Sequence, residues 1–356
     1  MKSFRVVGLM SGTSLDGLDV ADVTFNLSDS DQWSFTLNNA TLFPFEQNLL
    51  TLLKKAFQLP AHELIDLSSS LGRFYAERVN TFLSEIAIAP SQIDFIASHG
   101  QTVFHQPLKG YTLQIGNGPE LAVNTNIPTI VDFRTKDVAL GGNGAPLIPV
   151  ADHLLFANYA DTFLNLGGFS NFSFKKDEKV LSYDICPVNI VINELMRETG
   201  KEYDENGDFG KHGAINQDLL NQLNSLQFYE EEGPKSLGWE WVEEQIYPML
   251  IPEIPIRDKI RTFYEHVAFQ IGNALNKTNS KTTLVTGGGA KNHFLIKRIQ
   301  FYSEGEIVVP EENIVDFKEA IGFAFLGVLK WQEKINVWSS VTGSKRDSSS
   351  GIIIRP

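Results

Sequence analysis

Glycines, hydroxyl side chains and aspartates gather in one short stretch, GLMSGTSLDGLD, which runs from Gly8 to Asp19. A run of β-formers at 4–7 precedes the stretch and an alternating run at 20–25 follows it, so the pattern predicts a β-hairpin. Glycine puts no Cβ in the way of an approaching anion, and Asp16 and Asp19 would add carboxylate ligands for a hydrated Mg²⁺ ion. Hydroxyl donors come from Ser11, Thr13 and Ser14. The alternative is an ordinary hairpin, in which Asp-Gly is a common turn dipeptide.

A second polar cluster, from His99 to His105, follows an apolar run at 93–98 that is typical of a short buried strand. Open α/β sheets place their ligands just past the carboxyl ends of strands, so this cluster is a candidate site for a polar small molecule. Two histidines without a third ligand nearby do not favour zinc, and hydrogen bonding is their expected role. In the alternative, both histidines only satisfy backbone groups of the loop.

Two glycine-rich turns lie in the second half of the chain. Gly167-Gly168 stands between two strand-like runs, so the second half opens on a hairpin that echoes the first. Gly287-Gly288-Gly289 separates a buried strand-like run from a helix. Three successive glycines leave room for a flat group and expose a helix N-terminus. The turn is neither a Walker loop nor a dinucleotide fingerprint, because the glycine register breaks at Asn292.

Length and composition set the class of protein. A chain of 356 residues exceeds one typical core, and two domains are expected. A net charge of −13 argues against nucleic acid and against an anionic membrane surface as partners. The single cysteine, Cys186, excludes an internal disulfide and suits a reducing compartment. The chain starts in a strand-like run and has no apolar run of roughly 18 residues, so a cytoplasmic location is expected.

Helical and alternating patterns predict an α/β fold. Further strands are expected at 33–42, 129–131, 162–166, 170–174, 180–183, 283–286, 307–309 and 352–354. Helices are expected at 46–58, 62–88, about 147–158, 258–277, from the triple glycine to about 302, and about 317–333. The stretch 202–250 shows no clean period and is predicted to be an irregular insertion.

Paired glycine hairpins would grip a polyphosphate from two sides, and the triple glycine would lie under a base and ribose. This layout resembles the superfamily of sugar kinases, heat-shock chaperones and actin, in which nucleotide binds between duplicated domains. The resemblance implies a two-domain actin-like ATPase with ribonuclease H-like duplicated domains and a nucleotide cleft between them. We expect domains at 1–146 and 147–356, the second with the insertion at 202–250, and a tail at 334–356 that can return to the first.

Seven motifs in order, from residue 8 to about 352, sharpen the resemblance to the anhydro-N-acetylmuramic acid kinase family. They are GLMSGTSLDGLD, HGQTVFH, LQIGNGPELA, DFRTKDVALGGNGAPLIP, LNLGGFSNFSF, TGGGAKN and VTGSKRDSSSGI. The resemblance implies that ATP phosphates bind at Gly12, Thr13, Ser14, Leu15, Asp16, Gly17, Leu18 and Asp19. The layout adds nucleotide contacts from Gly167, Gly168, Asn171, Gly287, Gly288, Gly289 and Asn292. Sugar-site residues implied by the resemblance are His99, Gln101, Asp132, Arg134, Gly141–Gly144 and Asn189.

Catalysis in the family relies on an aspartate in a D-T-G-P-x-N pattern at a strand end. This chain reads Asp184-Ile185-Cys186-Pro187-Val188-Asn189, which keeps the aspartate, proline and asparagine but not the threonine and glycine. The resemblance therefore implies that Asp184 is the general base, the alternative being an aspartate that caps the following loop. Asn189 is expected to be a helix N-cap. Glu319 is a candidate partner of a sugar hydroxyl, or else a carboxylate that stabilises the start of its own helix.

A further departure from the family is KSLGWE at 235–240, where a threonine usually follows the serine and an arginine follows the glycine. The implied activity opens the ether bridge of 1,6-anhydro-N-acetylmuramic acid and phosphorylates O6, with ATP and Mg²⁺, in peptidoglycan recycling. The alternatives are a related kinase of another amino sugar and a non-catalytic nucleotide-binding module. The sugar is the expected partner, with no nucleic acid or membrane, and a homodimer is a further expectation.

Overall fold

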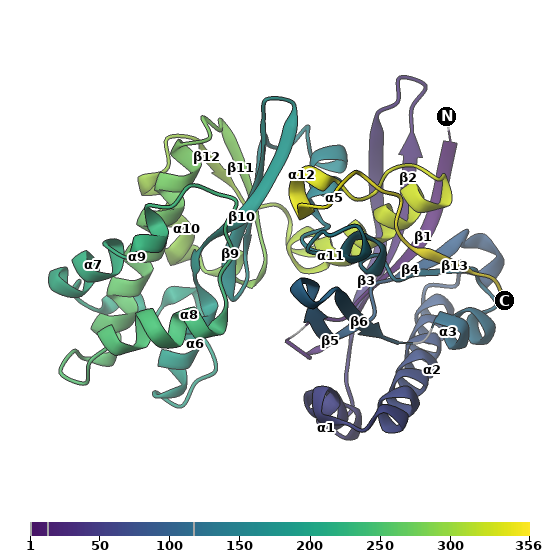
Figure 1. The fold of residues 1–356 in the computed structure, drawn as a ribbon, viewed down its shortest axis with the longest axis horizontal. Helices are drawn as coiled ribbons and strands as arrows, with labels where there is room; N and C mark the ends of the chain where they lie inside the picture. The colour runs from purple at the N-terminus through teal and green to yellow at the C-terminus, as the bar shows by residue number, and fades with distance from the viewer. Residues whose placement is uncertain (1, 13, 117) are drawn as a thin grey trace. The chain divides into compact units, whose positions relative to one another are not determined.

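The computed structural model describes residues 2–12, 14–116 and 118–356, and its contacts divide the chain into two compact units (Figure 1). Unit 1 is formed by Met1–Phe156 together with Phe317–Pro356, and unit 2 by Ala157–Asp316. The sequence predicted a boundary at 146/147 and a tail at 334–356 that can return to the first domain, whereas unit 1 contains 147–156 and the longer segment 317–356.

A six-stranded sheet forms the centre of unit 1. In spatial order its strands are β13 (Ile352–Ile354), β7 (Thr129–Val131), β4 (Phe95–Ser98), β1 (Lys2–Met10), β2 (Gly17–Leu27) and β3 (Trp33–Pro44). Strands β1, β2 and β3 form an antiparallel meander, and β4 and β7 run parallel to β1. The predicted hairpin around the first glycine-rich stretch is thereby confirmed, with Met10 opposite Asp19 at its mouth.

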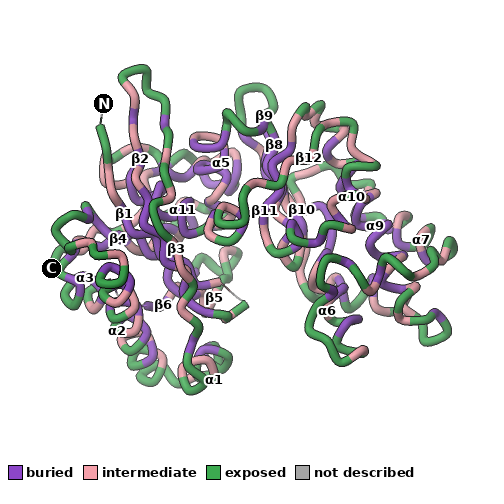
Figure 2. Tube along the Cα trace, turned by 180° about the vertical axis from the view of Figure 1, so that it is seen from behind, coloured by how far each residue is buried: buried purple, intermediate pink, exposed green. Residues whose placement is uncertain are grey.

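Helices cover both faces of this sheet, and the alternation along β1 assigns each residue to a face. Val7 and Leu9 belong to a core that includes residues of α2 (Ala61–Glu85). On the other face, a Cβ on Gly8 would lie 2.2 Å from the carbonyl oxygen of Ala320, so α11 (Glu312–Trp331) packs directly on the strand. Figure 2 shows β1, β4 and α11 as largely buried. This packing is why the segment after residue 316 belongs to unit 1.

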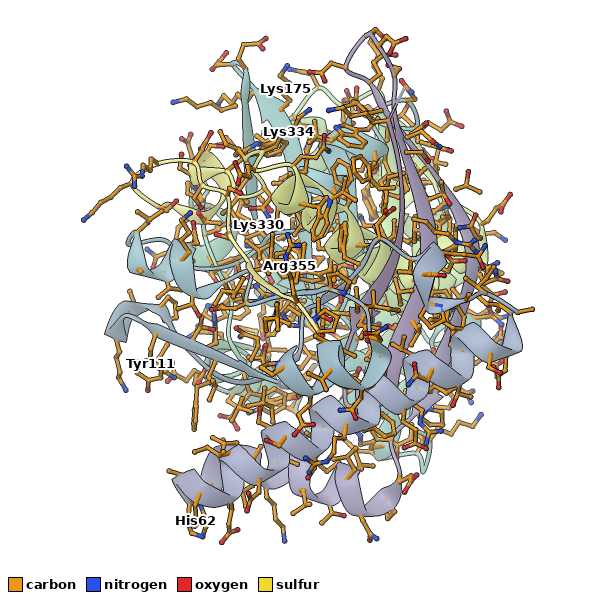
Figure 3. All side chains as sticks on the ribbon, turned by 90° about the vertical axis from the view of Figure 1, so that its right-hand side faces the viewer. His62, Tyr111, Lys175, Lys330, Lys334 and Arg355 are labelled. Carbon is orange, nitrogen blue, oxygen red and sulfur yellow. The ribbon has the colours of Figure 1, made fainter. Side chains whose placement is uncertain are left out.

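The C-terminal tail is tied to the same unit. Strand β13 pairs antiparallel with β7. Lys334 Nζ lies 5.6 Å from the Trp33 ring centroid and 3.4 Å from an oxygen of Asp31 (Figure 3). Arg355 lies over the ring of Trp331, which ends α11. The tail thus crosses back over the first part of the chain.

Unit 1 also contains a small hairpin that the sequence patterns did not predict, β5 (Gln101–Gln106) with β6 (Tyr111–Ile115). Its remaining helices are α1 (Gln47–Lys55), α3 (Gly118–Thr125), α4 (Thr135–Ala139), α5 (Pro149–Leu155) and α12 (Ser339–Thr342). Short 3₁₀ turns occur at Ala56–Gln58, Pro90–Gln92 and Pro107–Lys109.

Unit 2 repeats the strand order of unit 1. Its five-stranded sheet is ordered β10 (Lys179–Pro187), β9 (Phe169–Lys176), β8 (Thr162–Leu166), β11 (Thr282–Thr286) and β12 (Glu306–Val308). Strands β8, β9 and β10 form an antiparallel meander, and β11 and β12 run parallel to β8. Numbered within each sheet, the first five strands of both have the order 3-2-1-4-5, and β13 adds a sixth strand beside β7 in unit 1. The predicted class of duplicated α/β domains is confirmed.

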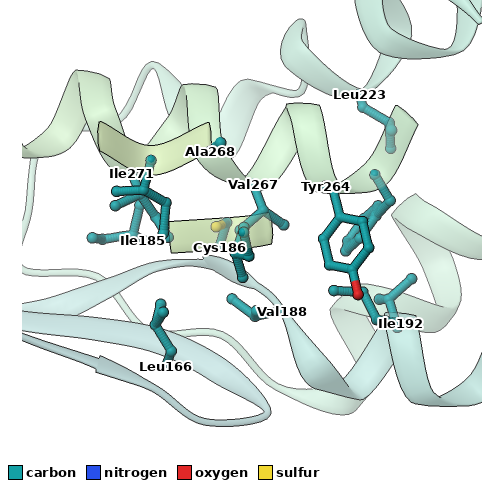
Figure 4. Close-up of a cluster of buried hydrophobic side chains, with 14 of the residues drawn as sticks. Leu166, Ile185, Cys186, Val188, Ile192, Leu223, Tyr264, Val267, Ala268 and Ile271 are labelled. Carbon is teal, nitrogen blue, oxygen red and sulfur yellow. The ribbon is translucent and has the colours of Figure 1, made fainter. Parts of the chain in front are cut away.

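The core of unit 2 lies between its sheet and α9 (Ile256–Asn276), the clearest predicted helix. Val267 and Ile271 of this helix pack near Cys186 and Ile185 of β10 (Figure 4). The other helices are α6 (Asn189–Arg197), α7 (Gln217–Asn224), α8 (Trp239–Trp241) and α10 (His293–Tyr302). A π-helix spans Val242–Ile246, and 3₁₀ turns occupy Glu205–Gly207, Gly210–His212, Gln227–Tyr229, Tyr247–Met249 and Gly288–Lys291. The predicted insertion therefore consists mainly of short helical turns.

Across the described residues, no helix is both long and apolar enough to cross a membrane.

Candidate functional site

The loop of the first hairpin, between β1 and β2, combines one buried anchor with exposed polar groups. Ser11 is buried, and its hydroxyl donates to the side-chain oxygen of Gln101. Ser14 and Asp16 are exposed. Leu15 has a φ of 59°, a left-handed conformation that is rare for a branched apolar residue and marks a tightly constrained turn. Ser11 thus anchors the base of the loop, and the exposed Ser14 and Asp16 at its tip are accessible to a ligand.

The other predicted phosphate residues surround this tip. Gly17 has no room for a Cβ, which would lie 2.3 Å from the carbonyl oxygen of Phe43. Leu18 is fully buried on β2, so its contribution to a ligand is limited to the backbone. Gly12 and Asp19 are half-buried. Thr13 lies outside the described residues.

His99 and Arg134 form a hydrogen-bonded pair in unit 1. Arg134 Nε donates to His99 Nε2 at 2.8 Å, and His99 Nδ1 lies 2.8 Å from the carbonyl oxygen of Gly100. Burial, and then the positive charge of Arg134, hold the pKa of His99 well below its usual value. A neutral ring with its proton on Nδ1 satisfies both bonds. His99 therefore orients Arg134. Its bond to the Gly100 carbonyl oxygen also agrees with the alternative in which the histidine satisfies a backbone group of the loop.

Arg134 reaches a second partner across the glycine-rich loop at 141–144. Its Nη1 donates to the carbonyl oxygen of Gly144 at 2.6 Å. Burial lowers the pKa of Arg134 to about 10, and the carboxylate of Glu319 opposes this shift, so the guanidinium stays charged at neutral pH. His99, Arg134 and the glycine-rich loop are thus joined by hydrogen bonds within unit 1, and their role as a sugar site stays a prediction.

Asp137 and Thr342 are site-supporting residues that the sequence reasoning missed. Asp137 is fully buried, accepts the Gly144 N–H at 2.8 Å through Oδ2 and accepts the Thr342 hydroxyl at 2.8 Å through Oδ1. Gly142 packs so close that a Cβ would lie 2.3 Å from Asp137 Oδ2. Both residues lie in motifs that carried the resemblance, which was the available signal. A buried carboxylate thus fixes the shape of the loop against the tail.

Two predicted sugar-site residues have different surroundings. Asp132 has a φ of 56° and accepts the N–H of Thr135 at the start of α4. Glu319 is exposed and stands eight residues into α11, which begins at Glu312 and not at the predicted 317. The alternative that Glu319 stabilises the start of its own helix is therefore wrong, because that effect is confined to the first turn.

His105, the second histidine of the polar cluster, lies on β5. Its Nδ1 is 3.1 Å from the hydroxyl of Thr112 on the facing strand. Partial burial, and then Arg134, lower its pKa. Its hydrogen bond within the small hairpin is consistent with a structural role.

In unit 2, Asn189 fixes the second glycine turn. Its side-chain amide donates to the carbonyl oxygens of Gly167 at 2.8 Å and Leu166 at 3.2 Å. The predicted N-cap role is wrong: Asn189 is the first residue of α6, Val188 precedes it, and no side chain caps this helix. The amide is used instead to close the turn between β8 and β9.

The triple glycine abuts the same turn. A Cβ on Gly287 would lie 2.5 Å from the Asn165 side chain, and a Cβ on Gly289 would lie 2.7 Å from Leu166. Gly288 has nothing within 4 Å of its Cβ position. The outer two glycines are therefore required by packing against β8, and the middle one leaves open space.

Asn292 anchors the end of this turn. Its side-chain oxygen accepts the N–H of Leu295 at 2.9 Å as the N-cap of α10, and its amide donates to the Tyr264 hydroxyl at 2.7 Å. Tyr264 in turn donates to Asp204 in the insertion. Because these contacts occupy the side chain, Asn292 is well suited to shape the turn.

Asp184 is half-buried on β10, opposite Asn171 of β9. Its Oδ2 accepts the N–H of Leu237 at 2.8 Å. Burial raises the pKa of Asp184, and the hydrogen bonds from Leu237 N–H and the Ser236 hydroxyl counteract this rise. A carboxylate with a raised pKa and partial exposure is suited to accept a proton.

The donor set in the first hairpin fits Mg²⁺ in its usual nucleotide-bound mode. No group of three or more His, Cys, Asp and Glu side chains among the described residues could hold a metal ion alone. Mg²⁺ beside phosphates takes one or two carboxylates and fills its remaining positions with water and phosphate oxygens. Asp16 at the exposed tip and Asp19 at the mouth of the hairpin match that requirement.

Two sheets that share the strand order 3-2-1-4-5 over their first five strands, each with a glycine turn between its first two strands, define an actin-like fold. The model of the anhydro-N-acetylmuramic acid kinase family matches residues 4–356, and the chain belongs to this family. Its members are ATP-using phosphotransferases of amino-sugar metabolism and peptidoglycan recycling.

Individual relatives match over nearly the full length. The chain is 35% identical over 372 residues to the anhydro-N-acetylmuramic acid kinase of Aliivibrio fischeri, covering 98% of each chain. It is 36% identical to the enzyme of that name from Pseudomonas savastanoi pv. phaseolicola, covering 91% of each. Among solved structures, it resembles the activator of the 2-hydroxyisocaproyl-CoA dehydratase from Clostridium difficile, with a TM-score of 0.43, 12% identity and coverage of 92% and 97%.

Proposed function

We propose that this chain uses ATP to phosphorylate O6 of 1,6-anhydro-N-acetylmuramic acid while a water molecule opens the internal ether bridge. The observation that carries the residue-level proposal is the half-buried Asp184 carboxylate, whose Oδ2 accepts the Leu237 N–H at 2.8 Å. Membership of the family supports the choice of sugar.

Asp184 acts as the general base in this proposal. It takes a proton from water as the water oxygen bonds to the anomeric carbon, and the bond between that carbon and O6 breaks. O6 then takes the γ-phosphoryl group, and ADP leaves. The products are N-acetylmuramic acid 6-phosphate and ADP, and one water is consumed in each turnover.

The remaining predicted residues hold the two substrates. Backbone N–H groups and hydroxyls from Gly12 to Asp19 bind the phosphates, and the turns at Gly167-Gly168 and Gly287–Gly289 supply further nucleotide contacts. Mg²⁺ at Asp16 and Asp19 would neutralise phosphate charge. Arg134 and Glu319 bind the sugar. His99 and Asn189 act by holding Arg134 and the second glycine turn in place.

A direct test compares ADP release with the anhydro sugar, with its ring-opened counterpart and without sugar. We expect release with the anhydro sugar, and label from H₂¹⁸O at the anomeric carbon of the product. Turnover only with sugars that carry a free hydroxyl, without label, would identify a different sugar kinase. ATP binding by calorimetry without sugar-dependent ADP release would identify a binding module.

Substitution Asp184→Asn tests the base. A general base contributes about 10²–10⁴-fold, so kcat should fall by that factor while ATP binding measured by calorimetry stays intact. Asp208→Asn, at an exposed aspartate of unit 2 that pairs with Lys211, is the matched control. Unchanged turnover in Asp184→Asn would reject the role.

Two broader expectations remain proposals. A single buried cysteine suits a reducing compartment, so we propose a cytoplasmic location, which cell fractionation would test. The homodimer stays a prediction, which sedimentation of the purified protein would test.

A further inference from the structure

We propose that the segment Lys235–Leu237 of the insertion is a positioning element, which holds the Asp184 carboxylate in one direction on β10. The inference rests on the proposed function of Asp184 and adds residues to it that act through the base and not on the substrate.

The strand itself leaves Asp184 at an irregular position. The pairing of β10 with β9 shifts between Asp184 and Cys186, which is a β-bulge. Ser170 on β9 locks this bulge, because its hydroxyl accepts the Cys186 N–H at 3.2 Å and donates to the Cys186 carbonyl oxygen at 2.9 Å. Bulges re-aim side chains next to active sites. The bulge fixes the backbone of Asp184 but not the rotation of its carboxylate.

Contacts from the insertion supply that second constraint. The Asp184 N–H donates to the carbonyl oxygen of Lys235 at 3.0 Å, and the Leu237 N–H donates to Asp184 Oδ2 at 2.8 Å. Ser236 adds a hydroxyl hydrogen bond to the same carboxylate. Three consecutive residues therefore contact the backbone and the side chain of Asp184. The hydrogen bond from residue 237 uses its backbone N–H. It therefore forms although this chain has leucine where the family usually has threonine.

Lys235 holds the segment in place. Its Nζ donates to the carbonyl oxygens of Phe228 at 2.5 Å and Glu231 at 2.9 Å, and lies 4.3 Å from the centroid of the Phe228 ring. Gly233 packs against Tyr183, where a Cβ would lie 2.5 Å from the ring. The Lys235 ammonium group thus stabilises the turn at 228–235, and this turn packs against Tyr183, the residue before Asp184.

In the described part of unit 2, the charged and titratable groups near Asp184 come from β10 and from the insertion. Tyr183 and Cys186 come from β10, and Glu232 and Lys235 come from the insertion; Asn171 of β9 is not titratable. Lys235 directs its ammonium at carbonyl oxygens of its own turn. The hydrogen bonds from 236 and 237 are thus the contacts that favour the ionised form of Asp184. A base must be ionised to act, so these contacts also affect the pH range of activity.

The first test is the pH dependence of kcat in Ser236→Ala. Loss of the hydroxyl hydrogen bond raises the pKa of Asp184, so the acid limb of the profile should move to higher pH. Activity on the alkaline side and the KM for ATP should stay close to wild type. Ser236→Thr keeps a hydroxyl and should restore the acid limb. The matched control is Ser225→Ala, in the same insertion, whose hydroxyl bonds to its own helix at Gln222.

The second test is Lys235→Met, which keeps an apolar stem and removes the ammonium. Displacement of a catalytic group costs up to about 10²-fold, so kcat should fall by about 10- to 100-fold at unchanged KM for ATP. Lys235→Arg should recover part of the loss, and Lys211→Met, at an exposed ion pair, should behave like wild type. Thermal unfolding shows whether Lys235→Met is folded. If it is not, the pH profile of Ser236→Ala alone tests the positioning role.

An acid limb in Ser236→Ala that coincides with wild type would overturn the inference, as would a wild-type kcat in folded Lys235→Met. If Asp184→Asn is inactive in either case, only the positioning role fails. If Asp184→Asn keeps full turnover, the proposed base itself is rejected.

Discussion

At the scale of single residues, Arg134 illustrates why the residue type matters. Its planar guanidinium donates to His99 Nε2 through Nε and to the Gly144 carbonyl oxygen through Nη1. Two donors in a fixed geometry connect the polar cluster after β4 with the glycine-rich loop. A lysine offers the same charge at a single nitrogen and cannot reproduce both contacts.

Substitution Arg134→Lys should therefore weaken the proposed sugar site selectively. A hydrogen bond from a charged group contributes about 1.5–3 kcal/mol, so kcat/KM for the sugar should fall by at least about 10-fold, since 1.36 kcal/mol corresponds to a tenfold change. The KM for ATP should not change. Arg73→Lys, at an exposed pair with Glu120, is the control. Equal losses for sugar and ATP would contradict a local role.

His266 in unit 2 gives a prediction about stability and pH. It is fully buried, with Nδ1 2.7 Å from the side-chain oxygen of Asn224 and Nε2 3.0 Å from the Tyr229 hydroxyl. Burial lowers its pKa to about 3. The ordinary histidine pKa in the unfolded chain is about 6.5. Between about pH 6.5 and 3 the unfolded chain therefore binds a proton at His266 that the native state does not bind.

The free energy of unfolding should thus decrease as pH falls from about 6.5 towards 3, and this one histidine should contribute up to about 1.4 kcal/mol per pH unit. His266→Gln should flatten the slope, as measured by denaturant unfolding at several pH values. The exposed His62, at the end of α2 in Figure 3, is the control, and His62→Gln should leave the slope unchanged. An unaltered slope in His266→Gln would refute the assignment.

At the scale of elements, the contact between β1 and α11 depends on the absence of a side chain. Gly8 faces Ala320 and Ala324, and Gly327 of the helix faces Ala97 and Phe95 on β4. Small residues on both elements let the helix lie directly on the strands. The contact between Gly8 and Ala320 joins residues more than 300 positions apart in sequence.

Gly8→Ala should destabilise the protein by about 1–3 kcal/mol, the usual cost of overpacking, because the new methyl would lie 2.2 Å from a backbone oxygen. Gly288→Ala is the matched control for stability, since nothing lies within 4 Å of its Cβ position and its φ is not left-handed. Denaturant unfolding measures both variants. Equal stability of Gly8→Ala and wild type would contradict the close contact.

At the scale of the whole molecule, unit 1 is built from two distant segments of chain, whereas unit 2 is continuous. Asn336 is fully buried and joins the second segment to itself: its amide donates to the carbonyl oxygens of Leu326 and Ser350, and its oxygen accepts the Ser350 N–H at 2.7 Å. The tail thereby follows α11 back to β13, which pairs with β7.

Asn336→Ala should remove one hydrogen bond from the Leu326 carbonyl oxygen and leave the buried backbone groups of Ser350 without this partner, and each buried unpaired group costs about 1–3 kcal/mol. Hydrogen exchange should accelerate in β7, β13 and α11 and stay unchanged in α9 of unit 2, because local stability follows cooperative units. Asn276→Ala, at an asparagine of α9 that donates to Tyr302, should show the opposite distribution. Acceleration spread evenly over both units would contradict the division.

The sequence by itself determined the local elements and the motifs. Alternation and helical periods predicted the meander strands, α2, α9 and the two glycine turns, because these signals are local and recur every two or 3.6 residues. The motif order indicated the family, and the family model confirmed it. The roles of Asp184, Arg134 and the hairpin residues stay predictions.

Only the tertiary structure decided which distant residues meet. No periodic signal relates Asp137 to Thr342, Leu237 to Asp184 or α11 to β1, because such contacts depend on how far-apart segments pack. Asn189 shows the same limit: its residue type suggested a helix cap, but a nearby turn offered two carbonyl oxygens to its amide. The hydrogen bonds that a side chain makes are set by the partners that folding brings within reach.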